Sequence, residues 1–265
     1  MKNYLFPIAL CLLTIGLYFS SCARDEDNTT SVTGFTISAA IPTSRTQFQY
    51  DATNKKVSVL WVKGDAITLI DGETKKAGIF TTQSEGSAAA NFTSSTFTKP
   101  NTGDNLYAFY PSVSTTGASA TFNCSPQKEN ESAMYSNTIY AGTTPVLQFH
   151  NAMALLKMTL SISKSVSKIT SVSISGNGLV CSGTLNASNG YWSSQHTGSI
   201  TVNNASGWTV TGNKITVYVH VIPQGIPVLH VSASDGSNTF SGVTDVSFSA
   251  TASKEYPIEV AVSLP

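Results

Sequence analysis

The chain has 265 residues, and its 15 basic and 15 acidic side chains give no formal net charge. Charged residues make up only 11% of the chain and no basic cluster stands out, which argues against a nucleic-acid partner. The composition is instead rich in Ser, Thr, Gly and Asn, interspersed with Val, Ile, Phe and Tyr. This mixture favours strands that are wet on one face, and the length suffices for one large β domain or two small ones.

The N-terminal segment has the layout of a secretory signal. Lys2 provides a positive start, Leu5–Phe19 is a nearly unbroken apolar run, and two serines precede Cys22. The run is shorter than the roughly 20 apolar residues that a membrane span needs. A cleaved signal is therefore favoured over a retained membrane helix.

The position of Cys22 makes this segment resemble a bacterial lipoprotein signal, although Phe19 stands where Leu is usual. The resemblance implies cleavage after residue 21, acylation of Cys22 and a flexible tether over residues 22–32. The acidic residues 25–27 resemble an export tag of Gram-negative surface lipoproteins. We therefore expect an outer-membrane lipoprotein, held in lipid through Cys22 and exposed at the cell surface or in fimbriae. An ordinary signal with an incidental cysteine is the alternative.

The first strand of the mature chain is predicted from a period of two. Phe35, Ile37, Ala39 and Ile41 alternate with smaller or polar residues, and a polar loop containing Arg45 follows. The next predicted strands are 57–61, 66–70, 78–82, 88–93, 106–110, 120–124, 146–149 and 153–162.

Two stretches of this half are less regular. Residues 125–142 are polar and predicted to be irregular, with a helical turn near Glu131–Tyr135. Residues 152–160 are apolar enough that a helix is the alternative to a strand, because periodicity does not separate the two in short apolar runs.

Asp71-Gly72 is a strong turn signal between two strands.

A Ser- and Lys-containing stretch over residues 161–168 is a plausible domain junction. Beyond it, strands are predicted over 169–174, 179–185, 199–203, 214–222, 228–233, 243–250 and 256–264. Short strands at this spacing are typical of sandwiches and barrels. The prediction is an all-β protein with two tandem β-sandwich domains, residues 33–160 and 161–265.

Several short motifs, taken in order, resemble the fimbrillin-like family of type V pilus subunits and relatives. They are TSRT (43–46), LWVKGD (60–65), YAFYP (107–111), PQ (126–127), FHNAMALL (149–156), IPQ (222–224) and KEY (254–256). The resemblance covers about residues 34–264. It implies two transthyretin-like sandwiches and a structural or adhesive role in a pilus.

The resemblance also implies a way of assembly. In the family's stalk subunits an Arg-specific protease removes the first strand, and a strand from another subunit fills the groove. Phe35, Ile37, Ala39 and Ile41 would form the removable strand. Arg45 is the candidate cleavage site, because the only other arginine, Arg24, lies in the tether. The alternating residues 256–264 are a candidate donor strand. A stalk, tip, anchor or stand-alone role, with or without cleavage, stays open.

The sequence contains none of the common motifs of enzymatic chemistry. The sequence has no HExxH, P-loop, GxGxxG, CxxC or GxSxG pattern, so we expect neither an enzyme nor a cofactor. If residues 223–227 form a hairpin turn, His220 lies opposite His230. A solvated pair is favoured there over a metal site, because no third ligand is visible.

A carbohydrate-binding surface lipoprotein that does not polymerise is the alternative function. Tyr191 and Trp192 follow an Asn-Gly pair and could stack on a sugar of a host or bacterial surface ligand, although packing on a sheet is the commoner use of such rings. Cys124 and Cys181 lie in different predicted domains. A disulfide between them is compatible with export, but two cysteines alone do not predict one.

Overall fold

The computed structural model describes residues 34–41, 49–51, 56–58, 60–128 and 132–265, with the backbone alone described for 49–51 and 56–58. These ranges belong to one unit, residues 34–265. They contain strands, turns and loops and no helix, which confirms the all-β prediction. Consequently none of the described segments is a helix that could cross a membrane.

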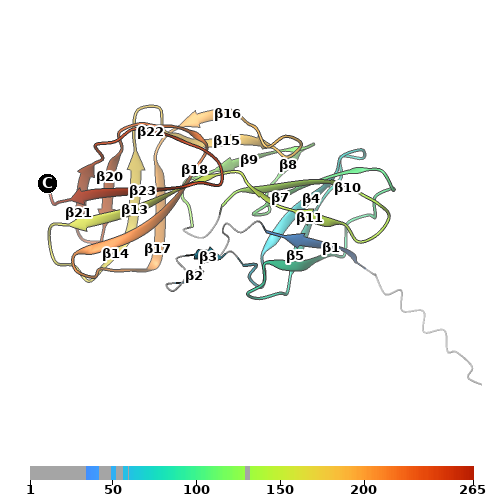
Figure 1. Ribbon diagram of the computed structural model, residues 1–265, viewed down its shortest axis with the longest axis horizontal. Helices are drawn as coiled ribbons and strands as arrows, with labels where there is room; N and C mark the ends of the chain where they lie inside the picture. Colours follow the sequence, from blue (N-terminus) through green and yellow to red (C-terminus); the bar gives the residue numbers. More distant parts are fainter. Residues whose placement is uncertain (1–33, 42–48, 52–55, 59, 129–131) are drawn as a thin grey trace, which may run out of the picture. The chain divides into compact units, whose positions relative to one another are not determined.

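The strands are β1 (Phe35–Ala40), β2 (Gln49–Asp51), β3 (Lys56–Ser58), β4 (Ala66–Asp71), β5 (Ala77–Thr82), β6 (Ala89–Ser94), β7 (Asn105–Tyr110), β8 (Thr115–Thr116), β9 (Ser119–Asn123), β10 (Met134–Ile139), β11 (Val146–Gln148), β12 (His150–Asn151), β13 (Ala154–Ile162), β14 (Lys168–Ser175), β15 (Val180–Asn186), β16 (Trp192–Thr197), β17 (Ile200–Thr209), β18 (Lys214–Val221), β19 (Gln224–Ile226), β20 (His230–Ser234), β21 (Thr239–Val243), β22 (Phe248–Ala250) and β23 (Glu255–Val262) (Figure 1).

The largest sheet has eight strands in the order β11-β1-β6-β5-β4-β7-β10-β12. Three smaller sheets have the orders β18-β13-β23, β17-β14-β20-β21 and β16-β15-β9-β8. The pairs β19-β22 and β2-β3 complete the described topology. Most neighbours are antiparallel, but β1 runs parallel to β11 and β13 runs parallel to β23.

Two hydrophobic cores organise these sheets. One lies against the eight-stranded sheet and includes Ile37, Phe92 and Leu106, while the other lies among the three smaller sheets. Strand β7 contributes Leu106 to the first core and Phe109 to the second, because adjacent strand residues point to opposite faces. This double burial explains why β4 and β7 read as continuous apolar runs rather than as alternating strands.

The structure corrects the prediction for the polar stretch over residues 125–142. Residues Met134 and Tyr135, expected in a helical turn, begin strand β10, which pairs with β7 over Asn105–Tyr110. Their pattern was obscured because β10 interleaves polar residues on both faces. The helical alternative for residues 152–160 is also wrong, because Ala154–Ile162 forms β13.

Several pairings cross the domain boundary predicted between residues 160 and 161. Strand β13 pairs with β18 and β23, which both follow that boundary in sequence. Strand β9 likewise pairs with β15. The division into two tandem domains stays a prediction, and these pairings show that hydrogen-bonded sheets combine segments from both sides of position 160.

Candidate strand-exchange site

Strand β1 lies between two hydrogen-bonded neighbours near one edge of the eight-stranded sheet (Figure 1). It pairs antiparallel with β6 over its whole length and parallel with β11 over Ser38–Ala40. Further backbone bonds run from Ser38 N to Pro145 O at 2.9 Å and from Phe149 N to Ala40 O at 3.0 Å. A vacated β1 position would therefore have N–H and C=O groups on both of its long sides.

The inward side chains of β1 fill the first core. Ile37 and Ala39 have no exposed surface, and Ile41, just beyond the strand, is 8% exposed. Phe35 is partly buried against the same core. Its ring centroid lies 5.8 Å from that of Phe97 and 6.1 Å from that of Phe80. The apolar residues that occur at every second position in the sequence are therefore the residues that face the core.

Trp61 lies in the first core and contacts the backbone of β1. Its indole Nε1 donates a hydrogen bond to the carbonyl oxygen of Ala39 at 3.1 Å, and both residues are fully buried. The ring makes edge contacts with Phe92, Tyr110 and Phe149 at centroid distances of 4.9, 5.3 and 5.7 Å. Aromatic rings therefore surround the Trp61 indole, and its N–H is the polar group that bonds to the backbone of β1.

Trp61 is held by the turn that follows it. Val62 N donates to Asp65 Oδ2 at 2.8 Å, and Tyr110 Oη donates to Asp65 Oδ1 at 3.2 Å. Sequence reasoning interpreted Trp61 as the end of an ordinary strand and missed its contact with β1. Trp61 and Ala39 are 22 positions apart, and a pattern among neighbouring residues does not predict a contact over that separation.

Two of the predicted site residues, Cys22 and Arg45, lie outside the described residues. The predicted removable strand is present as β1, with Ile41 just after it. The candidate donor, residues 256–264, corresponds largely to β23, whose Ile258, Val260 and Val262 are buried. In this structure β23 pairs with β13 along eight register positions, so donating it would remove the parallel neighbour of β13.

The candidate sugar-stacking residues differ in exposure. Tyr191 is 75% exposed, whereas Trp192 is partly buried and its Nε1 donates to Ala152 O at 3.0 Å. The Trp192 ring also lies edge-on to Phe122 at a centroid distance of 6.0 Å. Of these two aromatics, Tyr191 alone presents most of its surface to solvent.

The predicted histidine pair is wrong. His220 lies opposite Leu155 in β18 and is 1% exposed, whereas His230 lies in β20 opposite Ser175 and Val243. Residues 224–226 form β19, which pairs with β22 rather than turning a hairpin between the histidines. Within the described ranges, no three His, Cys, Asp or Glu side chains come together as metal ligands would.

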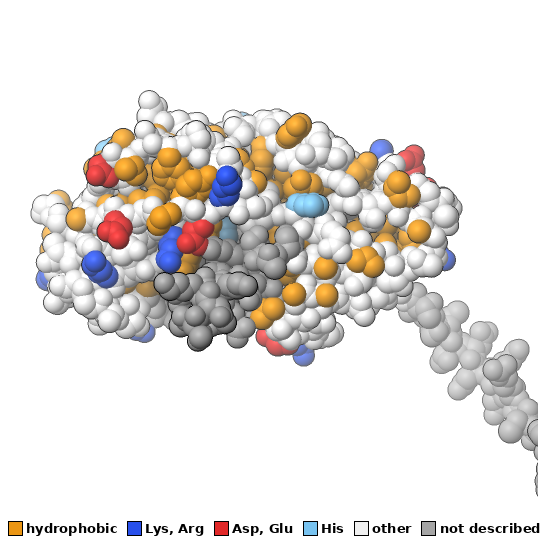
Figure 2. Space-filling view, in the orientation of Figure 1, with side chains coloured by type: hydrophobic (Ala, Val, Ile, Leu, Met, Phe, Trp, Pro, Cys, Tyr) orange, Lys and Arg blue, Asp and Glu red, His pale blue; other side chains and the backbone are white. Residues whose placement is uncertain are grey.

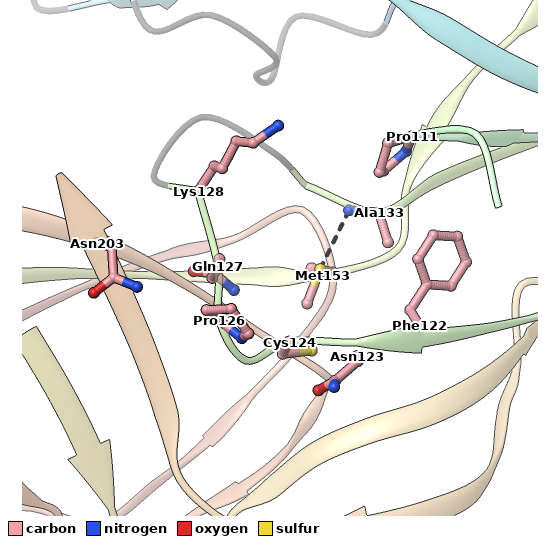
Figure 3. Close-up of a pocket in the computed structure, with 10 residues that line it drawn as sticks. All are labelled: Pro111, Phe122, Asn123, Cys124, Pro126, Gln127, Lys128, Ala133, Met153 and Asn203. Atoms are coloured by element: carbon pink, nitrogen blue, oxygen red, sulfur yellow. Dashed lines mark hydrogen bonds between the residues drawn. The ribbon is translucent and has the colours of Figure 1, made fainter. Parts of the chain in front are cut away.

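The two remaining cysteines are neighbours in space, although the sequence placed them in different domains. Cys124 N donates to Cys181 O at 2.7 Å, and both thiols are free. Burial raises the pKa of the Cys124 thiol to about 12, and the nearby Cys181 adds to this shift. Cys124 also lines a cavity of about 310 Å³ together with Phe122 and Met153 (Figure 3).

Charge is sparse over the part of the surface drawn in Figure 2, where basic and acidic side chains are scattered among polar and apolar ones. No single-sign patch marks a site on that face.

Comparison with known proteins agrees with this architecture. The model of the fimbrillin-like family matches residues 42–263, which is most of the sequence. The chain belongs to the fimbrillin-like family. The matched region begins just after β1. No curated protein matches the sequence.

Two crystal structures with TM-scores above 0.5 share this fold. A candidate cell adhesion protein from Bacteroides ovatus ATCC 8483 aligns with a TM-score of 0.57 at 11% identity, covering 86% of this chain and 91% of that one. A second, from Bacteroides uniformis ATCC 8492, gives 0.52 at 17% identity and covers 89% and 97%. The tip fimbrial protein Mfa3 from Porphyromonas gingivalis, truncated at its C-terminus, gives 0.39 at 8% identity and covers 87% and 96%.

Proposed function

We propose that this fimbrillin-like protein is a lipid-anchored surface component of a pilus, structural or adhesive, that joins other subunits by replacement of β1. The observation that carries the proposal is the setting of β1, a short strand with hydrogen-bonded neighbours on both sides and two fully buried side chains, Ile37 and Ala39. Unpaired strand edges beside an empty apolar groove favour the addition of a new strand.

The requirements on an incoming strand follow from the register. The strand must run antiparallel to β6 and parallel to β11, with apolar residues at every second position. Burial of Phe35, Ile37 and Ile41 contributes about 1.5–3 kcal/mol per fully buried side chain. With Phe35 only partly buried, the strand contributes roughly 4–8 kcal/mol. A donor strand with the same alternation of apolar residues would recover a similar free energy of burial.

Cleavage and anchoring complete the proposal. A cut at Arg45 would separate β1 from the rest of the body and also free that body from lipid at Cys22. If the loop is never cut, Cys22 remains the root and the protein acts as an anchor or a stand-alone surface module. Two transthyretin-like sandwiches, as in the family, are the proposed domain organisation, and no catalytic role is proposed.

Arg-specific proteolysis followed by mass spectrometry and electron microscopy tests the assembly. We expect a cut after Arg45, followed by polymers. Arg45→Lys is the matched control, because it keeps the charge and removes the cleavage site; it should stay monomeric under the same treatment. A cleaved chain that keeps β1 and remains monomeric, or polymers formed equally well by Arg45→Lys, would contradict strand replacement.

The anchor is tested separately. Intact mass measurement of the mature protein should show an acylated N-terminal Cys22, and Cys22→Ser should release the protein from the membrane fraction. An unacylated mature chain beginning elsewhere would refute the lipoprotein assignment without affecting the strand-exchange site.

Carbohydrate binding is the second candidate, and the high exposure of Tyr191 on the turn before β16 favours it. Glycan-array binding lost in Tyr191→Ala but kept in Trp192→Phe would support it, because Trp192 packs against Phe122. An array with no bound glycan would count against this function.

A further inference from the structure

We propose that Cys124 and Cys181 are a disulfide-forming pair that closes across β9 and β15 on oxidation. The inference rests on the proposed surface location in one respect: disulfides persist in extracytoplasmic compartments. The geometry of the pair follows from the pairing of β9 with β15.

The register places the two cysteines directly opposite each other. Strands β9 and β15 are antiparallel, with Phe122 opposite Gly183 and Asn123 opposite Ser182. Continuing this register by one position pairs Cys124 with Cys181, and the bond from Cys124 N to Cys181 O at 2.7 Å confirms the continuation. Opposite residues of this hydrogen-bonded type have Cα atoms about 5.5 Å apart, inside the range that a disulfide spans.

Both side chains point to the same face of the sheet. Directly opposite residues share a face, and Phe122 and Leu185, two positions from Cys124 and four from Cys181, belong to the second core. Cys124 is a member of that core and Cys181 packs against it. The opposite face carries Thr121 and Thr184, whose hydroxyl oxygens lie 3.0 Å apart.

The sulfur of Cys181 has a glycine as its neighbour. In the structure it lies beside Gly198, where a Cβ atom would come within 2.7 Å of Sγ. Cys181 is also the extra residue of an irregularity in the pairing of β15 with β16, between Val180 and Ser182. Closure therefore needs a side-chain rotation at Cys181 from Gly198 towards Cys124.

The oxidation consumes one external disulfide. The thiolate of the more exposed Cys181 attacks that disulfide, forms a mixed disulfide and releases one thiol. The thiolate of Cys124 then attacks the Cys181 sulfur and releases the second thiol. The two cysteines lose two protons and two electrons in total, and the external disulfide is reduced to two thiols.

Such a bond would tie together segments 57 positions apart in the sequence. It would hold the β8–β9 hairpin, which comes from the first half of the chain, to β15 from the second half. A covalent tie of this kind would keep the body of the subunit intact while β1 is exchanged.

Thiol mapping of the folded full-length protein in oxidised and reduced glutathione tests the pair. Trypsin cuts after lysine and arginine but not before proline, so Lys99-Pro100 stays intact and the bond should link peptide 77–128 to peptide 169–214, separately from the peptide that holds Cys11 and Cys22. The oxidised protein should run as a monomer on a non-reducing gel. We expect its melting midpoint to rise by about 5–15 °C over the reduced form.

A face-swapped variant is the matched control. Cys181→Ser combined with Ser182→Cys keeps two cysteines in reach but places one on the opposite face, so it should not close. Failure of the native pair to close while the protein stays folded, or equal closure in the control, would overturn the inference. Closure in vitro together with free thiols in protein trapped on cells would support the pair and count against the proposed surface location.

Discussion

Truncation of the central side chain of β1 is the sharpest test of the strand-exchange site. Ile37 is fully buried in the first core, and the strand that carries it is paired with β6 on one side and with β11 on the other. We expect Ile37→Ala to lower the free energy of unfolding of the uncut protein by about 2–5 kcal/mol. Thr36→Ala, on the other face of the same strand, should cost less than about 1 kcal/mol.

The same substitution should accelerate strand release once the loop is cut. If the lost burial energy appears in the dissociation of β1, release should be about 30-fold to several thousand-fold faster, at tenfold per 1.4 kcal/mol. Urea unfolding measures the first effect. The appearance of polymers after Arg-specific cleavage, or uptake of a labelled peptide of residues 35–41, measures the second.

One pair of results would refute the reasoning. If Ile37→Ala destabilises the uncut protein as expected but leaves both polymer formation and peptide uptake unchanged, burial of β1 does not control strand exchange. If Thr36→Ala accelerates release as much as Ile37→Ala, the buried face is not the determinant.

Three further predictions concern single groups around the cores. Trp61→Phe keeps an aromatic ring but removes the bond to Ala39 O and leaves a smaller ring in a fully buried site, so the free energy of unfolding in urea should fall by about 1–3 kcal/mol for the lost bond, with a further loss for the cavity; no loss would mean that this bond is replaced. Burial opposes ionisation of Asp71, but hydrogen bonds from Thr74 and Glu73 and the charge of Lys75 outweigh it and lower its pKa. The unfolded chain therefore binds more protons than the native protein, and stability should fall as pH drops below about 4; Asp71→Asn should flatten this part of the stability profile, and an unchanged profile would contradict the shift. Burial raises the pKa of Cys124 to about 12 from 9.0, with a contribution from Cys181, so the reduced protein should lose stability between these pH values. Measured against Cys124→Ala, that loss should be about 1.4 kcal/mol per pH unit, and parallel profiles of the two proteins would refute it.

The sequence determined the fold class and the buried face of β1 because both depend on local alternation. A period of two places Phe35, Ile37, Ala39 and Ile41 on one face whatever the partners are, and the structure buries that face. The turn at Asp71 was likewise predictable, because its carboxylate accepts hydrogen bonds from Glu73 and Thr74, two and three positions further along the chain.

The tertiary structure alone decided which strands are neighbours. Pairing is set by the complementarity of whole sheets, which no window of residues reports, so β10 and the partners of β13 were missed. For the same reason the predicted approach of His220 to His230 failed, whereas the unpredicted approach of Cys124 to Cys181 was found. The contact of Trp61 with Ala39 belongs to the same class. The alternation along a strand determines on which face each residue lies. The pairing of strands that are distant in sequence determines which residues pack against that face.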